Sequence, residues 1–305
     1  IGRFDHGIYQ IKMHTTPLSS FHRTAGNKYS RDIQSHCGHK VLNQENSKYK
    51  DWFHVKSFPI NFEDLIKRTK EKGWKDWYID KETGKDILPY HTFAHTPLMP
   101  KLNTENKELK EYLLEVAKYW IREFDIDGWR LDVANEVDHQ FWREFRIAVK
   151  EIKPEAYIVG EIWHDSTPWL QGDQYDSVMN YALTNASIKY FAKGEIDSKE
   201  FSETLAGILM RYSWQVNEVM LNLLDSHDTA RFINKANFDI QKLKLAELFM
   251  FTFIGAPMLY YGTEIGMTGE DDPDCRKGMI WDESKWDKEL LNFIKNLIKI
   301  RKENI

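Results

Sequence analysis

Three carboxylates stand out by their neighbours and by their spacing along the chain: Asp132, Glu161 and Asp228. Arg130 lies two residues before Asp132, and on a strand two such residues point to the same face. A neighbouring cation keeps a carboxylate ionised at neutral pH, which a nucleophile requires and a general acid does not. The spacing therefore suits either a carboxylate nucleophile at Asp132 or a purely structural ion pair, and this stretch alone does not decide between them.

The sequence around these residues predicts strands that lead into helices. Between residues 125 and 138, apolar side chains alternate with charged ones over the length of a strand, and helix-capping side chains follow. The same alternation continues downstream. Strands are expected at 126–133, 157–161, 176–181, 219–224 and 257–261, and helices at 106–123, 138–150, 197–212, 240–252 and 287–300.

Strands that alternate with helices predict a parallel sheet built from βα units. Asp132 and Glu161 are 29 residues apart, and Glu161 and Asp228 are 67 apart. An eight-unit barrel of about 250 residues has about 31 residues per unit, so these distances correspond to one and two units. We therefore expect a TIM-type (β/α)8 barrel, with all three carboxylates at the carboxyl ends of strands, where barrel enzymes place their chemistry.

The predicted barrel is not whole, and the chain is expected to have three parts. Residues 1–38 show no sustained period and hold a remnant of an early barrel strand, residues 39–104 form a small inserted domain rich in loops with little regular helix, and residues 105–305 supply the barrel units. Five clear strands, with a sixth near His36, fall short of the eight that a barrel needs. The barrel is therefore expected to be incomplete at its N-terminus.

Composition excludes several other classes of protein. The net charge is −5 and the pI is about 6.2, without a run of Lys or Arg, which argues against a nucleic-acid partner. The longest apolar run, residues 248–261, is shorter than the roughly 20 residues that cross a bilayer, so no membrane span is expected. Two cysteines make no disulfide framework, which favours a reduced, cytoplasmic setting.

Several segments resemble signature regions of a known family. Residues 128–136 (Gly-Trp-Arg-Leu-Asp-Val-Ala-Asn-Glu), 160–164 (Gly-Glu-Ile-Trp-His) and 224–229 (Leu-Asp-Ser-His-Asp-Thr) are similar to three regions of the α-amylase family of glycoside hydrolases. Residues 99–103 (Met-Pro-Lys-Leu-Asn) resemble the motif of the neopullulanase, cyclomaltodextrinase and maltogenic amylase branch. The resemblance covers about residues 36–302 in the family's order.

The resemblance implies a role for each matching residue. Asp132 would be the nucleophile, Glu161 the general acid/base, and Asp228 the carboxylate that orients the sugar and stabilises the transition state. Arg130 would keep Asp132 ionised, and His227 would contact the substrate.

The residues beside Glu161 fit its expected role. Ile162 and Trp163 would raise the pKa of its carboxyl group, as a general acid requires. Trp163 is either a sugar platform or a packing residue. Arg276 could reach a substrate hydroxyl, but a surface carboxylate is its expected partner.

The family's first region is mostly lost. Its Asp-Ala-Val-Phe-Asn-His reads Arg-Asp-Ile-Gln-Ser-His at residues 31–36, where only the final histidine remains. His36 would bind the sugar next to the cleaved bond. Ser35 replaces an Asn that binds metal in many relatives, so we expect no cofactor and find the case for a calcium site weak. The Tyr that stacks on the sugar in relatives has no counterpart in residues 1–30.

The sequence leads to a hydrolase and leaves one alternative open. The expected reaction is retaining hydrolysis of α-1,4 glucosidic bonds in cyclodextrins, pullulan, starch or maltooligosaccharides, and cleavage of α-1,6 bonds is left open. The alternative is a catalytically inactive amylase-fold module that binds carbohydrate or protein. An incomplete barrel predicts little turnover by this chain, although its three carboxylates are intact. The resemblance leaves dimerisation open.

Overall fold

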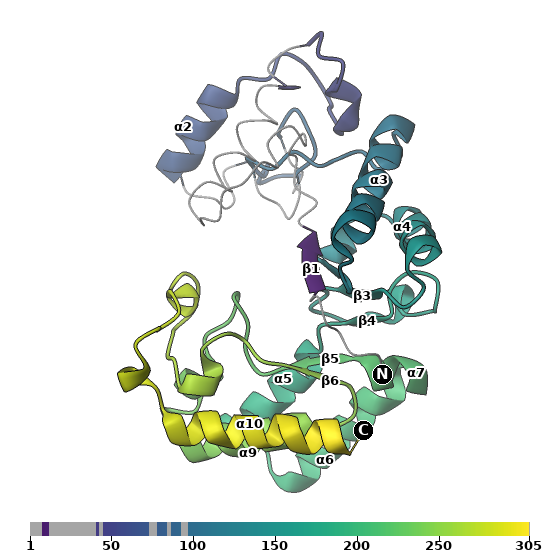
Figure 1. Cartoon of the computed structure of the whole chain (residues 1–305). Helices are drawn as coiled ribbons and strands as arrows, with labels where there is room; N and C mark the ends of the chain where they lie inside the picture. The colour runs from purple at the N-terminus through teal and green to yellow at the C-terminus, as the bar shows by residue number, and fades with distance from the viewer. Residues whose placement is uncertain are drawn as a thin grey trace. The chain divides into compact units, whose positions relative to one another are not determined.

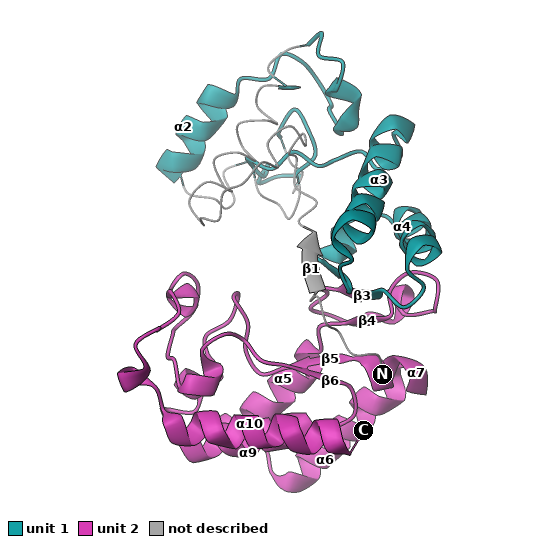
Figure 2. Ribbon diagram, in the orientation of Figure 1, with its two compact units in different colours: residues 1–157 teal, residues 158–305 magenta. Residues whose placement is uncertain are grey.

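A computed structural model describes residues 8–11, 41–42, 45–72, 78–83, 87–92 and 97–304 (Figure 1). The chain divides into two compact units, unit 1 with residues 1–157 and unit 2 with residues 158–305 (Figure 2). The division falls within strand β3 (Tyr157–Gly160). The domain limits expected at residues 38 and 104 both lie inside unit 1, and they stay predictions.

Unit 1 contains a strand that sequence reasoning did not identify. β1 (Ile8–Ile11) pairs in parallel with β2 (Gly128–Leu131), with Ile8 opposite Gly128. The sequence showed only a short apolar run at this place, because four residues are too few to display a period. Pairing with β2, more than a hundred residues away, makes this segment a strand, although residues 1–38 show no sustained period.

Two capped helices flank β2. α3 (Lys107–Phe124) precedes the strand and α4 (His139–Ile152) follows it, and the two helices pack against each other (Figure 1). Asn106 accepts a hydrogen bond from the Leu109 amide at 3.0 Å, and so satisfies one of the free N–H groups at the start of α3. The predicted strand and both predicted helices are present, with bounds shifted by a few residues.

The segment between residues 41 and 102 has more helix than expected. It contains the 3-10 turn η2 (Lys50–Trp52) and the 11-residue helix α2 (Phe62–Lys72). Phe62, Leu65 and Thr69 lie on the buried face of α2, a helical spacing that sequence reasoning passed over. The helix α2 was not predicted, but the rest of the described segment is mostly loops and isolated bridges, in keeping with the prediction of little regular helix. Antiparallel bridges join Phe53 to Leu102, Val55 to Tyr90 and Thr92 to Pro100.

Unit 2 is built on short parallel strands. Residues of β3 pair with β4 (Ser177–Val178), and β5 (Leu221–Leu223) pairs with β6 (Ala256–Met258). A parallel bridge between Met179 and Leu221 joins the two pairs. Parallel strands need crossover connections, and α-helices supply the one between β5 and β6, as the alternation in the sequence predicted. Between β3 and β4 the chain has only the 3-10 turn η4 (Thr167–Trp169).

The helices of unit 2 lie between and after these strands. They are α5 (Tyr181–Ser187), the π-helix η5 (Ile188–Lys193), α6 (Ser198–Arg211), α7 (Trp214–Val219), α8 (Phe232–Lys235), α9 (Ile240–Thr252) and α10 (Lys288–Glu303). Sequence reasoning identified α6, α9 and α10 and missed the short ones, which carry too few residues for a period. The strand expected at 176–181 is shorter, because α5 begins at Tyr181.

The core of unit 2 lies beneath its longest helices. α9 and α10 run alongside each other (Figure 1), and buried side chains of both join one hydrophobic cluster with α8. The cluster includes Phe232, Leu243, Met250, Leu290 and Ile294. Within the described part of the chain, no helix is both long and apolar enough to cross a membrane.

Candidate active site

Asp132 follows β2 directly and forms an ion pair with Arg130, whose Nη1 contacts Asp132 Oδ1. Both residues are less than 10% exposed. The expectation that they share one side of the strand is therefore confirmed by their contact. Removing one partner of this buried ion pair would leave the other charge uncompensated.

The turn after Asp132 has an unusual backbone. Val133 adopts the left-handed conformation (φ 44°, ψ 47°), which is rare for a β-branched residue because of steric conflict. Surrounding contacts must hold such a turn. The Trp142 ring donates its Nε1–H to the Ala134 carbonyl at 2.9 Å, and Asp138 caps α4 by accepting from the Gln140 amide at 2.7 Å. Contacts from α4 thus fix the chain on the C-terminal side of Asp132.

The branch motif at residues 99–103 contacts this same turn. Lys101 forms an ion pair with Glu136 at 3.2 Å, and both line a cavity of about 360 Å³ together with His54 and His139. Burial, with His91 close by, lowers the pKa of His54, so its ring is neutral at pH 7. The motif therefore helps to build a polar cavity within unit 1, beside the turn that follows Asp132.

Glu161 follows β3 directly and is only 2% exposed. The Tyr181 hydroxyl donates a long hydrogen bond to Glu161 Oε1 at 3.5 Å. The Trp163 ring stacks on the Tyr181 ring, with centroids 3.6 Å apart and planes 11° from parallel. Tyr181 therefore contacts the buried carboxyl group of Glu161 on one side and, on the other, the Trp163 ring, which is 52% exposed.

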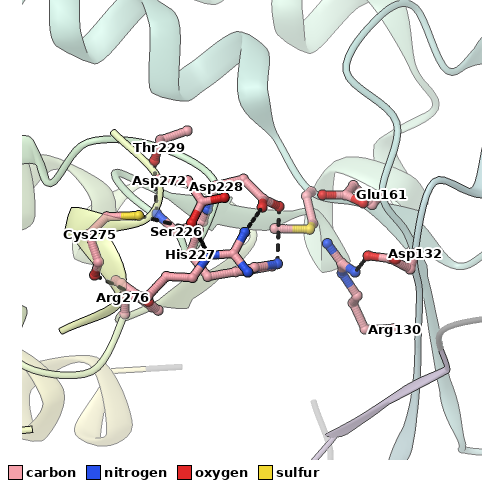
Figure 3. A network of polar contacts seen from close by, with 12 residues as sticks. Arg130, Asp132, Glu161, Ser226, His227, Asp228, Thr229, Asp272, Cys275 and Arg276 are labelled. Carbon is pink, nitrogen blue, oxygen red and sulfur yellow. Dashed lines mark hydrogen bonds and ion pairs between the residues drawn. The ribbon is translucent and has the colours of Figure 1, made fainter. Parts of the chain in front are cut away.

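Asp228 lies in the loop after β5, and both of its carboxylate oxygens have partners (Figure 3). Arg276 Nη2 contacts Asp228 Oδ1 at 2.7 Å, and His227 Nε2 lies 3.0 Å from Asp228 Oδ2. Arg276 Nε also donates to the His227 carbonyl at 2.8 Å. Arg276 also pairs with the exposed carboxylate of Asp272 at 2.9 Å, as expected, and the half-buried Asp228 is a further partner that the sequence did not predict.

Buried polar side chains hold the base of the Asp228 loop. Asp225 accepts from the Phe232 amide at 3.0 Å and from the Thr263 hydroxyl at 3.3 Å, and burial raises the pKa of its carboxyl group. Glu247 on α9 is fully buried; burial raises its pKa well above the usual value, and Asp225 adds to the shift. Asp225 thereby links the loop of Asp228 to the turn that contains Thr263.

Comparison with known proteins identifies the family. The sequence pattern described as the alpha amylase catalytic domain matches residues 24–285. The chain is 51% identical over 278 residues to a cyclomaltodextrinase of Geobacillus thermopakistaniensis strain MAS1, covering 89% of this chain and 44% of that protein. The chain belongs to the alpha-amylase family.

Other members of the alpha-amylase family agree with this result. An intracellular maltogenic amylase of Bacillus subtilis strain 168 is 48% identical over 263 residues, covering 86% of this chain and 40% of that protein. A solved cyclomaltodextrinase structure aligns with a TM-score of 0.76 and 51% identity, covering 88% of this chain and 42% of that one. The chain thus spans less than half the length of these relatives.

Family membership confirms the predicted fold class and branch. The catalytic domain of the alpha-amylase family is a TIM barrel, and relatives at about 50% identity carry the names cyclomaltodextrinase, maltogenic amylase and neopullulanase. His36 and Ser35 lie outside the described residues. Among those described, no group of three or more His, Cys, Asp or Glu side chains is placed to hold a metal ion, and the question of calcium stays a prediction.

Sequence reasoning missed Tyr181 as a partner of Glu161 and Asp228 as a partner of Arg276. Tyr181 is an aromatic residue at the end of the strand predicted at 176–181, a signal that was present but ambiguous. Arg276 stands 48 residues from Asp228, and no local pattern connects the two.

Proposed function

We propose that this chain is a retaining glycoside hydrolase that cleaves α-1,4 glucosidic bonds, and also α-1,6 bonds, in α-glucan substrates. Asp132 is the nucleophile, Glu161 the general acid/base and Asp228 the residue that orients the sugar. The observation that carries the proposal is the buried pairing of Asp132 with Arg130 directly after β2. A carboxylate held ionised at the carboxyl end of a parallel strand is suited to attack an electrophilic carbon.

The environments of the other two carboxyl groups support this division of roles. Glu161 is buried against an aromatic pair and receives the Tyr181 hydroxyl, whereas Asp228 is about one-third exposed between a histidine and an arginine. Carboxyl groups in different environments can take the acid and the nucleophilic roles of one reaction.

The first step forms a covalent intermediate. Asp132 attacks the anomeric carbon as the glycosidic bond breaks, and Glu161 gives its proton to the departing oxygen, so that a glycosyl ester of Asp132 and a free sugar hydroxyl result. Asp228 accepts hydrogen bonds from hydroxyl groups of the ring and stabilises the positive charge of the oxocarbenium-like transition state.

The second step releases the sugar. Glu161, now ionised, takes a proton from water, whose oxygen attacks the anomeric carbon and displaces Asp132. Two inversions leave the configuration of the anomeric carbon unchanged, and Glu161 recovers its proton. Arg130 stabilises Asp132 as a leaving carboxylate in this step.

The substrate class follows from the relatives. Their names include cyclomaltodextrinase, maltogenic alpha-amylase and neopullulanase, which supports cyclodextrins, pullulan, starch and maltooligosaccharides as substrates of this chain. A relative named intracellular maltogenic amylase, together with the low cysteine count, supports a cytoplasmic location.

The test is hydrolysis of β-cyclodextrin and pullulan by residues 1–305, beside the Asp132→Asn variant. Because the barrel is expected to be incomplete, we expect only low turnover by the wild type. This turnover should be lost in the variant, and a fluorinated glucosyl inhibitor should label Asp132 covalently. Product analysis by NMR should show the α-anomer first.

Two results would contradict the proposal. Labelling of Glu161 or Asp228 would overturn the assignment of the nucleophile. Wild-type turnover no higher than that of Asp132→Asn would favour the non-catalytic module that the sequence left open, and binding of maltotriose without hydrolysis would then identify it.

A further inference from the structure

The loop that carries His227 and Asp228 is held along one side by the segment 269–276 (Figure 3). The Arg231 amide donates to the Gly269 carbonyl at 2.9 Å, and the Ala230 amide donates to Asp271 Oδ1 at 3.2 Å. These two contacts fix the backbone directly after Asp228. Further along the segment, the side chains of Cys275 and Arg276 contact His227 and Asp228.

Cys275 and Arg276 both donate to the backbone oxygen of His227. The Cys275 thiol lies 3.2 Å from that carbonyl oxygen, and Arg276 Nε lies 2.8 Å from it. Burial raises the pKa of the Cys275 thiol, so it stays protonated and can act as a donor. Two donors on one carbonyl oxygen restrict the peptide between His227 and Asp228.

The guanidinium group of Arg276 is itself fixed in orientation. Its Nε lies 2.9 Å from Asp272 Oδ1 and 2.8 Å from the His227 carbonyl oxygen. The Nε–H group of the guanidinium therefore already has two acceptors. Because the guanidinium is planar and rigid, this fixes the direction of Nη2, which lies 2.7 Å from Asp228 Oδ1. A lysine has one flexible donor group and could not make these contacts together.

The contacts of Asp228 leave room for a ligand. Arg276 occupies one lone pair of Oδ1, and His227 occupies one of Oδ2. An ionised carboxylate offers about four acceptor sites, so each oxygen keeps capacity for one sugar hydroxyl. With both oxygens held, the plane of the carboxylate is set before the ligand arrives, which reduces the entropy lost on binding.

We propose that Arg276 is a positioning residue that acts through Asp228: it fixes the plane of that carboxylate, and the backbone of His227, so that Asp228 meets two hydroxyl groups of the sugar. This inference rests on the proposed function. If Arg276 acts through Asp228, replacing Arg276 should have little effect on kcat/KM once Asp228 can no longer orient the sugar. A direct contact between Arg276 and the sugar would keep its effect in that background.

The test is a double-mutant cycle with Arg276→Gln and Asp228→Asn in the full chain, read as kcat and KM for maltotriose. We expect Arg276→Gln to lower kcat/KM about 10- to 100-fold in the wild-type background, and less than about 2-fold in the Asp228→Asn background. Arg276→Lys should stay impaired, since it keeps the charge but loses the fork.

Lys277→Gln is the matched control. Lys277 is the next residue in the chain and forms an exposed ion pair with Asp274 at 2.9 Å, so its loss should leave kcat/KM unchanged. Thermal unfolding of all variants separates a general loss of structure from a loss of positioning. A full effect of Arg276→Gln in the Asp228→Asn background would overturn the inference, as would full activity of Arg276→Lys.

Failure of the proposed function would be recognised separately. If the wild type shows no turnover above Asp132→Asn, the same cycle is read as the affinity for maltotriose by calorimetry. Coupling of 10-fold or more between Arg276 and Asp228 in that affinity would support the inference. Additive effects, or no binding by the wild type, would overturn it.

Discussion

Trp163 has one ring face against Tyr181 and is 52% exposed, a geometry that suits a platform for the apolar face of a sugar ring. We expect Trp163→Ala to weaken β-cyclodextrin binding about 3- to 10-fold, the effect of one aromatic contact. Calorimetry would measure this change. The free energy of unfolding should fall by less than about 1 kcal/mol, because half of the side chain is already in water.

Trp281 supplies the control for this prediction. It is 80% exposed and lies outside the contacts described for the site, so Trp281→Ala should leave the affinity unchanged. Equal affinity of Trp163→Ala and wild type would show that Trp163 only packs on Tyr181, the second reading that the sequence allowed.

Glu247 should make the stability of the fold depend on pH. Burial raises its pKa well above its usual value of 4.5, and the charges of Asp225 and Glu264 add to the shift, so the folded state binds a proton that the unfolded state releases. The stabilisation is complete below pH 4.5 and is lost as pH rises through the folded pKa, by about 1.4 kcal/mol per pH unit in that window.

The variant Glu247→Gln is neutral at every pH and tests this directly. Urea unfolding at pH 5, 6, 7 and 8 should show a steeper loss of stability for the wild type than for Glu247→Gln. Some slope should persist in the variant, because burial also raises the pKa of Asp225. Identical slopes in the two proteins would show that Glu247 ionises without cost to the fold.

Strand β2 depends on a glycine where it approaches β3. A Cβ atom built on Gly128 would lie 2.1 Å from the Tyr157 carbonyl oxygen, a clash with backbone that no rotamer relieves. The strand pairing would have to shift, and with it the Arg130–Asp132 pair that follows on the same strand. The strand that precedes Asp132 thus tolerates no side chain at its first residue.

Gly128→Ala should therefore destabilise the protein by at least about 2 kcal/mol. The matched control is Gly207→Ala on α6, where an added Cβ meets no atom within 4 Å and replacement of a helical glycine should stabilise by about 0.5–1 kcal/mol. Both values come from urea unfolding at one pH. A Gly128→Ala protein as stable as wild type would mean that the two strands have space to separate.

At the scale of elements, the sequence predicted what local patterns encode. Helix starts were predicted where a capping side chain precedes an apolar period, and Asp138 indeed accepts from two amides at the start of α4. Short elements such as β1 and α7 were missed, since four to six residues cannot show a period. Contacts with the rest of the fold give them their conformation.

The whole molecule carries a net charge of −5 with a pI of about 6.2. At pH 8 we expect an anion exchanger to retain it and a heparin column to release it at about 0.15 M salt, because no basic run offers a site for a polyanion. Its solubility should be lowest near pH 6.2, where self-repulsion vanishes. Retention on heparin above that salt concentration would reveal a basic surface that the sequence does not show.

The sequence by itself determined which carboxylates stand at the ends of strands and their order along the chain. Asp132, Glu161 and Asp228 could be found from their neighbours and their spacing, because strand period and unit length are local properties of a chain. The pairing of Arg130 with Asp132 was predictable for the same reason, since the two residues lie on one side of a single strand.

Only the tertiary structure decided which distant residues support that chemistry. Arg276 contacts Asp228, 48 residues away in the chain, and Tyr181 contacts Glu161, 20 residues away. β1 pairs with β2 although Ile8 and Gly128 are more than a hundred residues apart. Such contacts depend on how whole elements pack, and packing is set by the fit of many side chains together. No spacing or composition within one stretch of sequence records them, so the partners of the catalytic carboxylates became visible only in the folded chain.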